Sequence, residues 1–349
     1  MRENKEKQYN PAIDALRLVS ILAVILIHTT TRTLEAANFD LQRTPWTLFL
    51  NQISRFAVPL FFMISGLVLE LNYSFHPNYL TYLRKRFNRL FVPYVFWSGV
   101  YYFFIYTNHN INFLSALIQG SSSYQLYFIP TLLIFYIFFP LVHKFYNVIS
   151  NKWTLIFLGI FQIALLYYDY YIHPIMFSYP IKIAFLNYYI FLLGIVVSHH
   201  RESLMEFIKK WKIPLSFLTI ILANYIFFEG GSLYLKTHNY LSFYSQWRPD
   251  VFLYTLTLGS LLYYFFSKRT LIFPIIQKLS RLSFFVFFVH VIVLENIWHK
   301  IALPIFQKSH THIAGQLWYD PLFFLVITLV SFGIAFAIHK IPILPKLTG

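Results

Sequence analysis

The chain has 349 residues, of which 58% are hydrophobic and only 12% are charged, so it is too apolar to cover itself as a soluble globule. Its net charge of +15 would suit nucleic acid, but the basic residues are spread over many loops with no folded domain to present them, which argues against nucleic-acid binding. The absence of cysteine excludes disulfide bonds, a thiol nucleophile and thiolate metal sites.

Apolar segments long enough to cross a membrane recur along the whole chain and predict an all-α, polytopic bundle of about ten transmembrane helices. Lysine and arginine are concentrated in alternate loops, which places both termini in the cytoplasm and the protein in a bacterial plasma membrane. No loop leaves room for a soluble domain, so residues 1–349 are expected to form one membrane domain. Hydropathy places the spans near 11–29, 47–70, 88–107, 125–143, 153–171, 180–198, 213–229, 250–266, 283–301 and 322–341.

The first span contains two ionisable residues, Arg17 and His28, whose spacing places them on one face of a helix. Eleven residues of helix rotate the second side chain to within about 20° of the direction of the first, and the two lie about 16 Å apart along the axis. Asp14 lies near the same face of the helix. Because charges facing lipid are costly, this face is expected to meet a bundle interior or a water-filled cavity. His28 is the candidate general base, and Arg17 can hold a phosphate or stabilise an oxyanion; the alternative for His28 alone is an interhelical hydrogen bond.

The second span begins with Arg55 and contains Ser65 followed by Gly66. Arg55 lies near the outer end, where its side chain can either extend to the membrane surface or bind a substrate. The Ser65 and Gly66 pair favours close packing of two helices, and exposure of the serine hydroxyl to a ligand is the alternative.

A basic cluster that includes Arg84, Arg86 and Arg89 precedes the third span. Its position fits an orientation signal with lipid contact, or a clamp for a multiply phosphorylated cytosolic ligand, because guanidinium groups suit phosphates. At the outer start of the fourth span, Tyr124 can stack against a sugar or belong to the interfacial aromatic belt.

The ninth span contains His290, with Glu295 and His299 following it. His290 and Glu295 are too poorly aligned on a helix to predict a dyad. The sequence has neither a tight zinc-binding motif nor a phosphate-binding loop, so neither a metal site nor a permanently bound cofactor is expected.

Four stretches in this order resemble the acyltransferase 3 family of integral membrane acyltransferases. They are the Arg17 and His28 pair, the segment 61–66, the basic stretch 84–94 and the segment 282–290. The resemblance extends over nearly the whole chain. The chain is also similar to the intercellular-adhesin polysaccharide proteins, which are described as O-succinyltransferases or as export proteins.

The resemblance implies a membrane O-acyltransferase that moves an acyl group, usually acetyl, from cytosolic acyl-CoA to a hydroxyl of a cell-envelope polysaccharide or lipid-linked sugar. Arg17 and His28 are then the catalytic pair. The candidate substrate-binding residues are Arg84, Arg86 and Arg89 toward the donor, with Asp14, Arg55, Ser65, Tyr124 and His290. Membrane lipids and a polysaccharide synthase are the other expected partners. The alternative function is a polysaccharide exporter or flippase without acyl transfer. The polar face of the first span would then line the translocation path.

Overall fold

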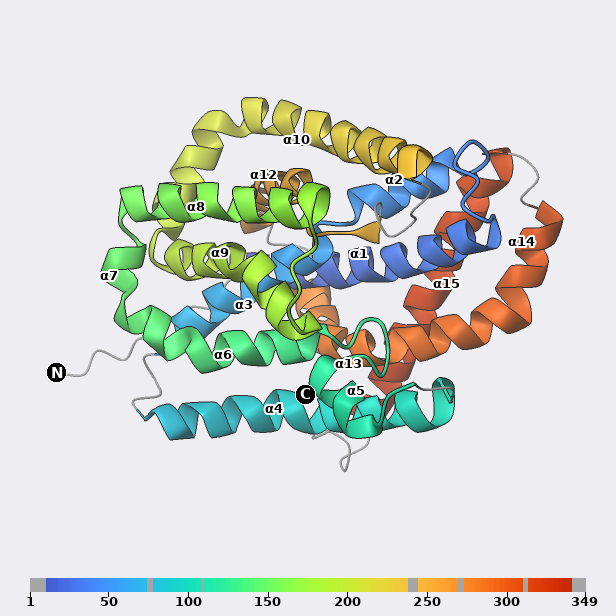
Figure 1. Cartoon of the computed structure of the whole chain (residues 1–349), viewed down its shortest axis with the longest axis horizontal. Helices are drawn as coiled ribbons and strands as arrows, with labels where there is room; N and C mark the ends of the chain where they lie inside the picture. Colours follow the sequence, from blue (N-terminus) through green and yellow to red (C-terminus); the bar gives the residue numbers. More distant parts are fainter. Residues whose placement is uncertain are drawn as a thin grey trace.

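The computed structural model describes residues 11–73, 78–107, 110–237, 244–268, 273–309 and 313–340, and all regular structure in these ranges is helical (Figure 1). The longer helices are α1 (Pro11–Ala36), α3 (Ala57–Tyr73), α4 (Tyr79–Val100), α6 (Phe128–Lys144), α8 (Lys152–Tyr167), α9 (Tyr179–His199), α10 (Arg201–Thr237), α12 (Pro249–Ser267), α13 (Phe273–Ile297) and α15 (Ile313–His339). The shorter elements are α2 (Pro45–Ile53), α5 (Phe113–Gln119), α7 (Tyr146–Ile149), α14 (Leu303–Ser309) and the π-helical turns η1 (Tyr101–Ile105), η2 (Tyr168–Ile172) and η3 (Trp298–Ala302).

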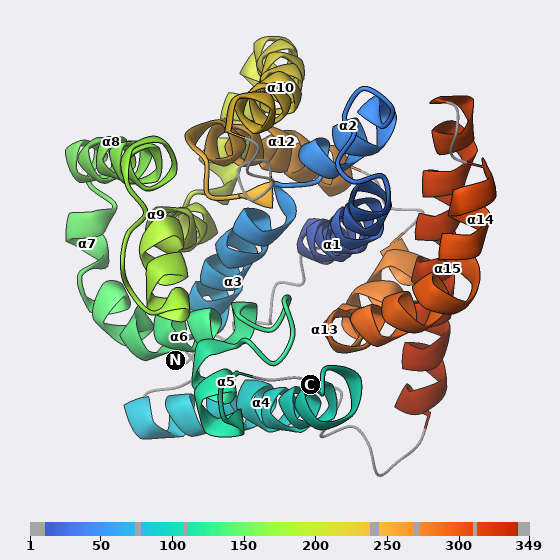
Figure 2. The same ribbon diagram turned by 45° about the vertical axis from the view of Figure 1, so that its right-hand side comes forward.

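Helix α1 lies in the interior of the bundle. It packs against α2, α3, α12, α13 and α15, and Figure 2 shows these helices grouped around it. Most of α1 is buried, whereas α8, α10 and α15 are largely exposed. The polar face of α1 therefore meets other helices and the space between them.

The exposed surfaces of the outer helices are apolar. Phe157 and Ile160 on α8, Phe217 and Ile221 on α10, and Leu329 on α15 are each at least half exposed. Exposed apolar side chains on helices whose backbone groups are satisfied internally are typical of a surface that faces lipid. The protein is therefore a multi-pass membrane protein.

Seven helical segments in the described part of the chain are long and apolar enough to cross a membrane. They cover seven of the ten predicted spans. Three predicted spans coincide with helices that do not meet the same length and hydropathy limits. They are 88–107 on α4 with η1, 125–143 on α6 and 250–266 on α12. Helix α4 carries the basic cluster, α6 has only 17 residues, and α12 is rich in tyrosine and threonine. Crossing by these three helices stays a prediction.

The second predicted span, 47–70, coincides with one candidate membrane span, Pro45–Tyr73, which is built from two helices. Helix α2 ends at Ile53 and α3 begins at Ala57. Pro59 lies in the first turn of α3, where its missing N–H removes no helical hydrogen bond. The break places Arg55 in a turn between the two helices.

Helices α3 and α9 cross with their backbones in contact. A Cβ atom on Gly66 would lie 2.2 Å from the Phe191 carbonyl oxygen, and one on Gly194 would lie 2.0 Å from the Met63 carbonyl oxygen. Only glycine allows this approach, which is typical of helix pairs in membranes. The prediction that Gly66 packs two helices closely is confirmed.

We expect Gly194→Val to destabilise the protein by at least about 1–3 kcal/mol, because a larger side chain at a filled crossing forces the helices apart. The measurement is the melting temperature of the detergent-purified protein. The matched control is Gly333→Val on α15, because nothing lies within 4 Å of the position of a Cβ atom there. Equal melting temperatures for the two variants would contradict the tight crossing.

Candidate active site

One cavity of about 1090 Å³ follows the polar face of α1. The α1 residues on its wall run from Asp14 to Glu35, a distance of about 31 Å along a helix axis. The hydrocarbon core of a bilayer is about 30 Å thick. The cavity therefore extends along a length of α1 comparable to the thickness of a membrane.

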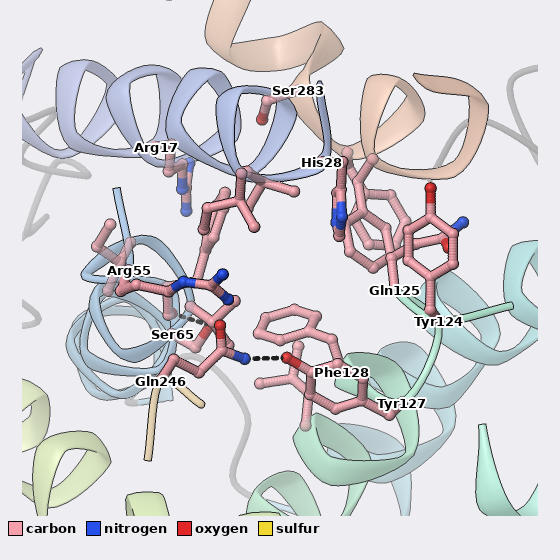
Figure 3. Close-up of a pocket in the computed structure, with 18 of the residues that line it drawn as sticks. Arg17, His28, Arg55, Ser65, Tyr124, Gln125, Tyr127, Phe128, Gln246 and Ser283 are labelled. Atoms are coloured by element: carbon pink, nitrogen blue, oxygen red, sulfur yellow. Dashed lines mark hydrogen bonds between the residues drawn. The ribbon is translucent and has the colours of Figure 1, made fainter. Parts of the chain in front are cut away.

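Arg17 and His28 both line this cavity, which confirms that they share one face of α1. Figure 3 shows the two side chains on the same wall with open space beneath them. Arg17 Nη1 lies 3.3 Å from Asp14 Oδ1, and the Ser280 hydroxyl of α13 donates to the same carboxylate oxygen at 3.0 Å. The separation of about 16 Å along α1 places the two groups at different levels of the cavity.

His28 is held by ring contacts. Its ring centroid lies 4.7 Å from that of Tyr124 and 5.4 Å from that of His290, with the two imidazoles stacked at 28°. Within the described ranges no protein group hydrogen-bonds to either ring nitrogen of His28. A ring that is oriented by packing, with free nitrogens facing a cavity, can accept a proton from a substrate hydroxyl.

His290 lies behind His28 and is not among the residues that line the cavity. Its side chain is fully buried, and its Nδ1–H donates to the Val286 carbonyl oxygen at 3.0 Å. A carbonyl oxygen can only accept, so Nδ1 carries a proton. His290 therefore supports the ring of His28 from behind.

One end of the cavity is cationic. Arg86 and Arg89 of α4 and Arg281 of α13 line it together with Arg17. Positions 86 and 89 are three residues apart and share a helix face. Arg84 is exposed and does not line the cavity, so this end brings together two of the three predicted donor arginines.

Arg32, one helical turn after His28, connects α1 to α13 through an ion pair. Its guanidinium pairs with Glu35 at 2.7 Å and with Glu295, and it lies 6.0 Å from the centroid of the Tyr124 ring. The Tyr106 hydroxyl also donates to Glu295 at 3.1 Å. Glu295 thus orients Arg32 beside the Tyr124 ring.

The far end of the cavity is lined by aromatic and polar side chains from three separate segments. The Tyr127 ring contacts the rings of Tyr179 and Trp247, and Gln246 donates a hydrogen bond to the Tyr127 hydroxyl (Figure 3). The Tyr127 hydroxyl accepts this hydrogen bond and can also donate one. Rings with hydroxyl and amide groups between them suit a sugar.

Arg55 and Ser65 also line the cavity. Arg55 is 4% exposed and turned inward, so it does not extend to the membrane surface. The Ser65 hydroxyl donates to the Phe61 carbonyl oxygen at 2.8 Å. Tyr124 contacts the catalytic candidate His28, so its ring lies in the cavity wall.

A family model described as an acyltransferase domain, that of acyltransferase 3, matches residues 10–340. The chain belongs to the acyltransferase 3 family. Similar curated proteins are named probable poly-beta-1,6-N-acetyl-D-glucosamine export protein. The one from Staphylococcus aureus (strain MSSA476) is 25% identical over 301 residues, which cover 81% of this chain and 82% of that protein. The one from Staphylococcus epidermidis is 25% identical over 305 residues and covers 81% of each chain. No solved structure matches this acyltransferase 3 protein.

Several cavity residues of this acyltransferase 3 protein were missed by the sequence analysis. Arg32 follows His28 by one helical turn, and this spacing alone is a signal that it shares the face. Arg281, Gln246 and Trp247 carry no such signal, because they belong to segments far from α1 in the sequence. The described residues contain no group of three or more His, Cys, Asp or Glu side chains placed to hold a metal ion.

Proposed function

We propose that this protein is an O-acyltransferase of the bacterial plasma membrane. It moves an acyl group, acetyl in the first instance, from cytosolic acyl-CoA to a hydroxyl of a cell-envelope polysaccharide or lipid-linked sugar. The cavity carries the proposal, because it joins a cationic end at Arg86 and Arg89, the free imidazole of His28 and an aromatic end at Trp247. These three features suit the CoA phosphates, proton transfer and a glycan, in that order along α1.

The proposed topology has ten crossings, with α4, α6 and α12 added to the seven candidate spans, and both termini in the cytoplasm. Basic residues are favoured on the cytoplasmic side. Arg84 to Arg89 then face the cytosol, where acyl-CoA is found, and the Trp247 end faces outward. A polysaccharide synthase is a natural partner, because it would deliver the growing glycan to that outer end.

The reaction needs one proton acceptor and a positioned thioester. His28 takes the proton of the acceptor hydroxyl as the hydroxyl oxygen bonds to the carbonyl carbon of the thioester. The carbon–sulfur bond then breaks, and the CoA thiolate takes the proton from His28. Arg17 holds the donor at a distance from the reacting carbon, so its contribution is orientation.

Reconstituted protein with radiolabelled acetyl-CoA tests the proposal. We expect label to appear in a poly-β-1,6-N-acetylglucosamine or lipid-linked sugar acceptor, with one free thiol of CoA released for each acyl group transferred. In vesicles whose Arg86 end faces the donor, label should accumulate only on acceptor at the opposite face.

The names of the staphylococcal relatives favour a second function, export of a polysaccharide without acyl transfer. The aromatic end of the cavity suits a sugar path as well as it suits an acceptor site. An exporter would move labelled glycan into vesicles without consuming acyl-CoA. Glycan movement with no thiol release would therefore replace the acyltransferase proposal with the exporter.

A further inference from the structure

Arg55 is a buried cation without a carboxylate partner in the described part of the chain. Its Nη1 donates to the Tyr244 carbonyl oxygen at 2.6 Å, and its Nη2 donates to Asn51 Oδ1. Its Nε atom has no hydrogen-bond partner among the described residues. The guanidinium also lies 5.4 Å from the centroid of the Tyr244 ring. These contacts fix its position, but none of them supplies a negative charge.

Outside the cationic end, the other cations that line the cavity are neutralised. Lys182 pairs with Asp169 at 2.8 Å. Arg32 is neutralised by two glutamates from different helices. A buried charge left without a counter-charge is strongly destabilising. Retention of Arg55 in this state indicates that its counter-charge arrives with a ligand or develops during a reaction.

Figure 3 shows Arg55 and His28 on opposite walls, with the Arg55 guanidinium directed into the open space of the cavity. An uncharged hydroxyl and an uncharged thioester carbonyl bring no negative charge to this space. Negative charge appears only when the hydroxyl oxygen bonds to the carbonyl carbon. A fixed cation at that place matches an electrostatic role in the transition state.

We infer that Arg55 is a catalytic residue that stabilises the oxyanion formed on the thioester carbonyl during acyl transfer, an inference that rests on the proposed function. As the acceptor oxygen bonds to the carbonyl carbon and its proton moves to His28, the carbonyl electron pair moves onto oxygen. The Arg55 guanidinium stabilises the negative charge on that oxygen. The electron pair re-forms the carbonyl double bond when the carbon–sulfur bond breaks, and the thiolate leaves with the proton from His28.

Arg55→Gln tests this role because glutamine keeps a hydrogen-bonding side chain and removes the charge. We expect kcat to fall about 100- to 1000-fold, the loss seen when one oxyanion donor is removed, with the KM values for acetyl-CoA and acceptor changed less than about threefold. Arg55→Lys should recover part of kcat. Added methylguanidinium should raise the rate of an Arg55→Ala variant and leave wild type unchanged.

The matched control is Arg43→Gln, which removes an exposed arginine paired with Asp40 and outside the cavity. It should keep wild-type kcat. A purely structural role for Arg55 would lower the melting temperature and give no rescue by methylguanidinium. A rise in a KM with unchanged kcat would assign Arg55 to an anionic group on the substrate, and either result would overturn the oxyanion role.

Binding of acetate gives a readout that needs no turnover. Against chloride at equal ionic strength, acetate should raise the melting temperature of wild type and of Arg43→Gln, but not of Arg55→Gln, because a ligand stabilises only the state that binds it. Equal acetate effects in wild type and Arg55→Gln would refute the anion site. If wild type binds acetate through Arg55 but transfers no acyl group, the proposed function fails while the anion site stands.

Discussion

Replacing His28 by asparagine should lower the kcat of acyl transfer about 100- to 10,000-fold, the usual contribution of a general base. Among the described residues the imidazole makes ring contacts and no hydrogen bond, so its removal should leave the fold and the binding of acetyl-CoA intact. The measurement is the initial rate of label transfer to the acceptor, with donor binding by calorimetry on the same preparation.

A matched control for this prediction is His200→Asn, since His200 is exposed, contacts the Tyr146 hydroxyl at 3.3 Å and does not line the cavity. It should transfer at the wild-type rate. The transfer rate of His290→Asn should lie between those of His28→Asn and His200→Asn, because His290 packs behind His28 and does not face the substrate. Full activity of the His28 variant would remove the base from the mechanism.

Substitution of both Arg86 and Arg89 by glutamine should raise the KM for acetyl-CoA about 100-fold or more with little change in kcat. Each lost hydrogen bond between a guanidinium and a phosphate removes about 1.5–3 kcal/mol. Binding of the donor to wild type should also weaken with added salt, and this dependence should be reduced in the variant.

Lys85→Gln is the matched control for the arginine pair, because Lys85 is exposed on the same helix and does not line the cavity. Arg84→Gln separates two expectations. The family resemblance predicts a donor contact at Arg84, whereas its place outside the cavity favours a small effect. A KM unchanged in the double variant would mean that the cationic end does not bind the donor.

The parts of the site that the sequence predicted depend on local helix geometry. Arg17 and His28 share a face because the period of an α-helix fixes which positions align. The same reasoning applies to Gly66, whose missing side chain already indicated a close helix crossing. Both features lie within one segment, and neither needs knowledge of how distant segments meet.

The remaining features depend on contacts between segments far apart in the chain. Glu295 reaches Arg32 across 263 residues, and the Tyr244 carbonyl reaches Arg55 across 189 residues. Hydropathy predicts the second span but does not reveal the turn at Arg55 that divides it into two helices. No periodicity within a single segment contains this information.

The extent of the cavity along α1 has an electrical consequence for the proposed reaction. Each unit charge that crosses a membrane gains or loses about 2.3 kcal/mol per 100 mV. With the donor phosphates retained at the Arg86 end, only an uncharged acyl group passes along the cavity. The membrane voltage then does no work on the transfer, so a cell that has lost its voltage would still be able to modify its envelope glycan.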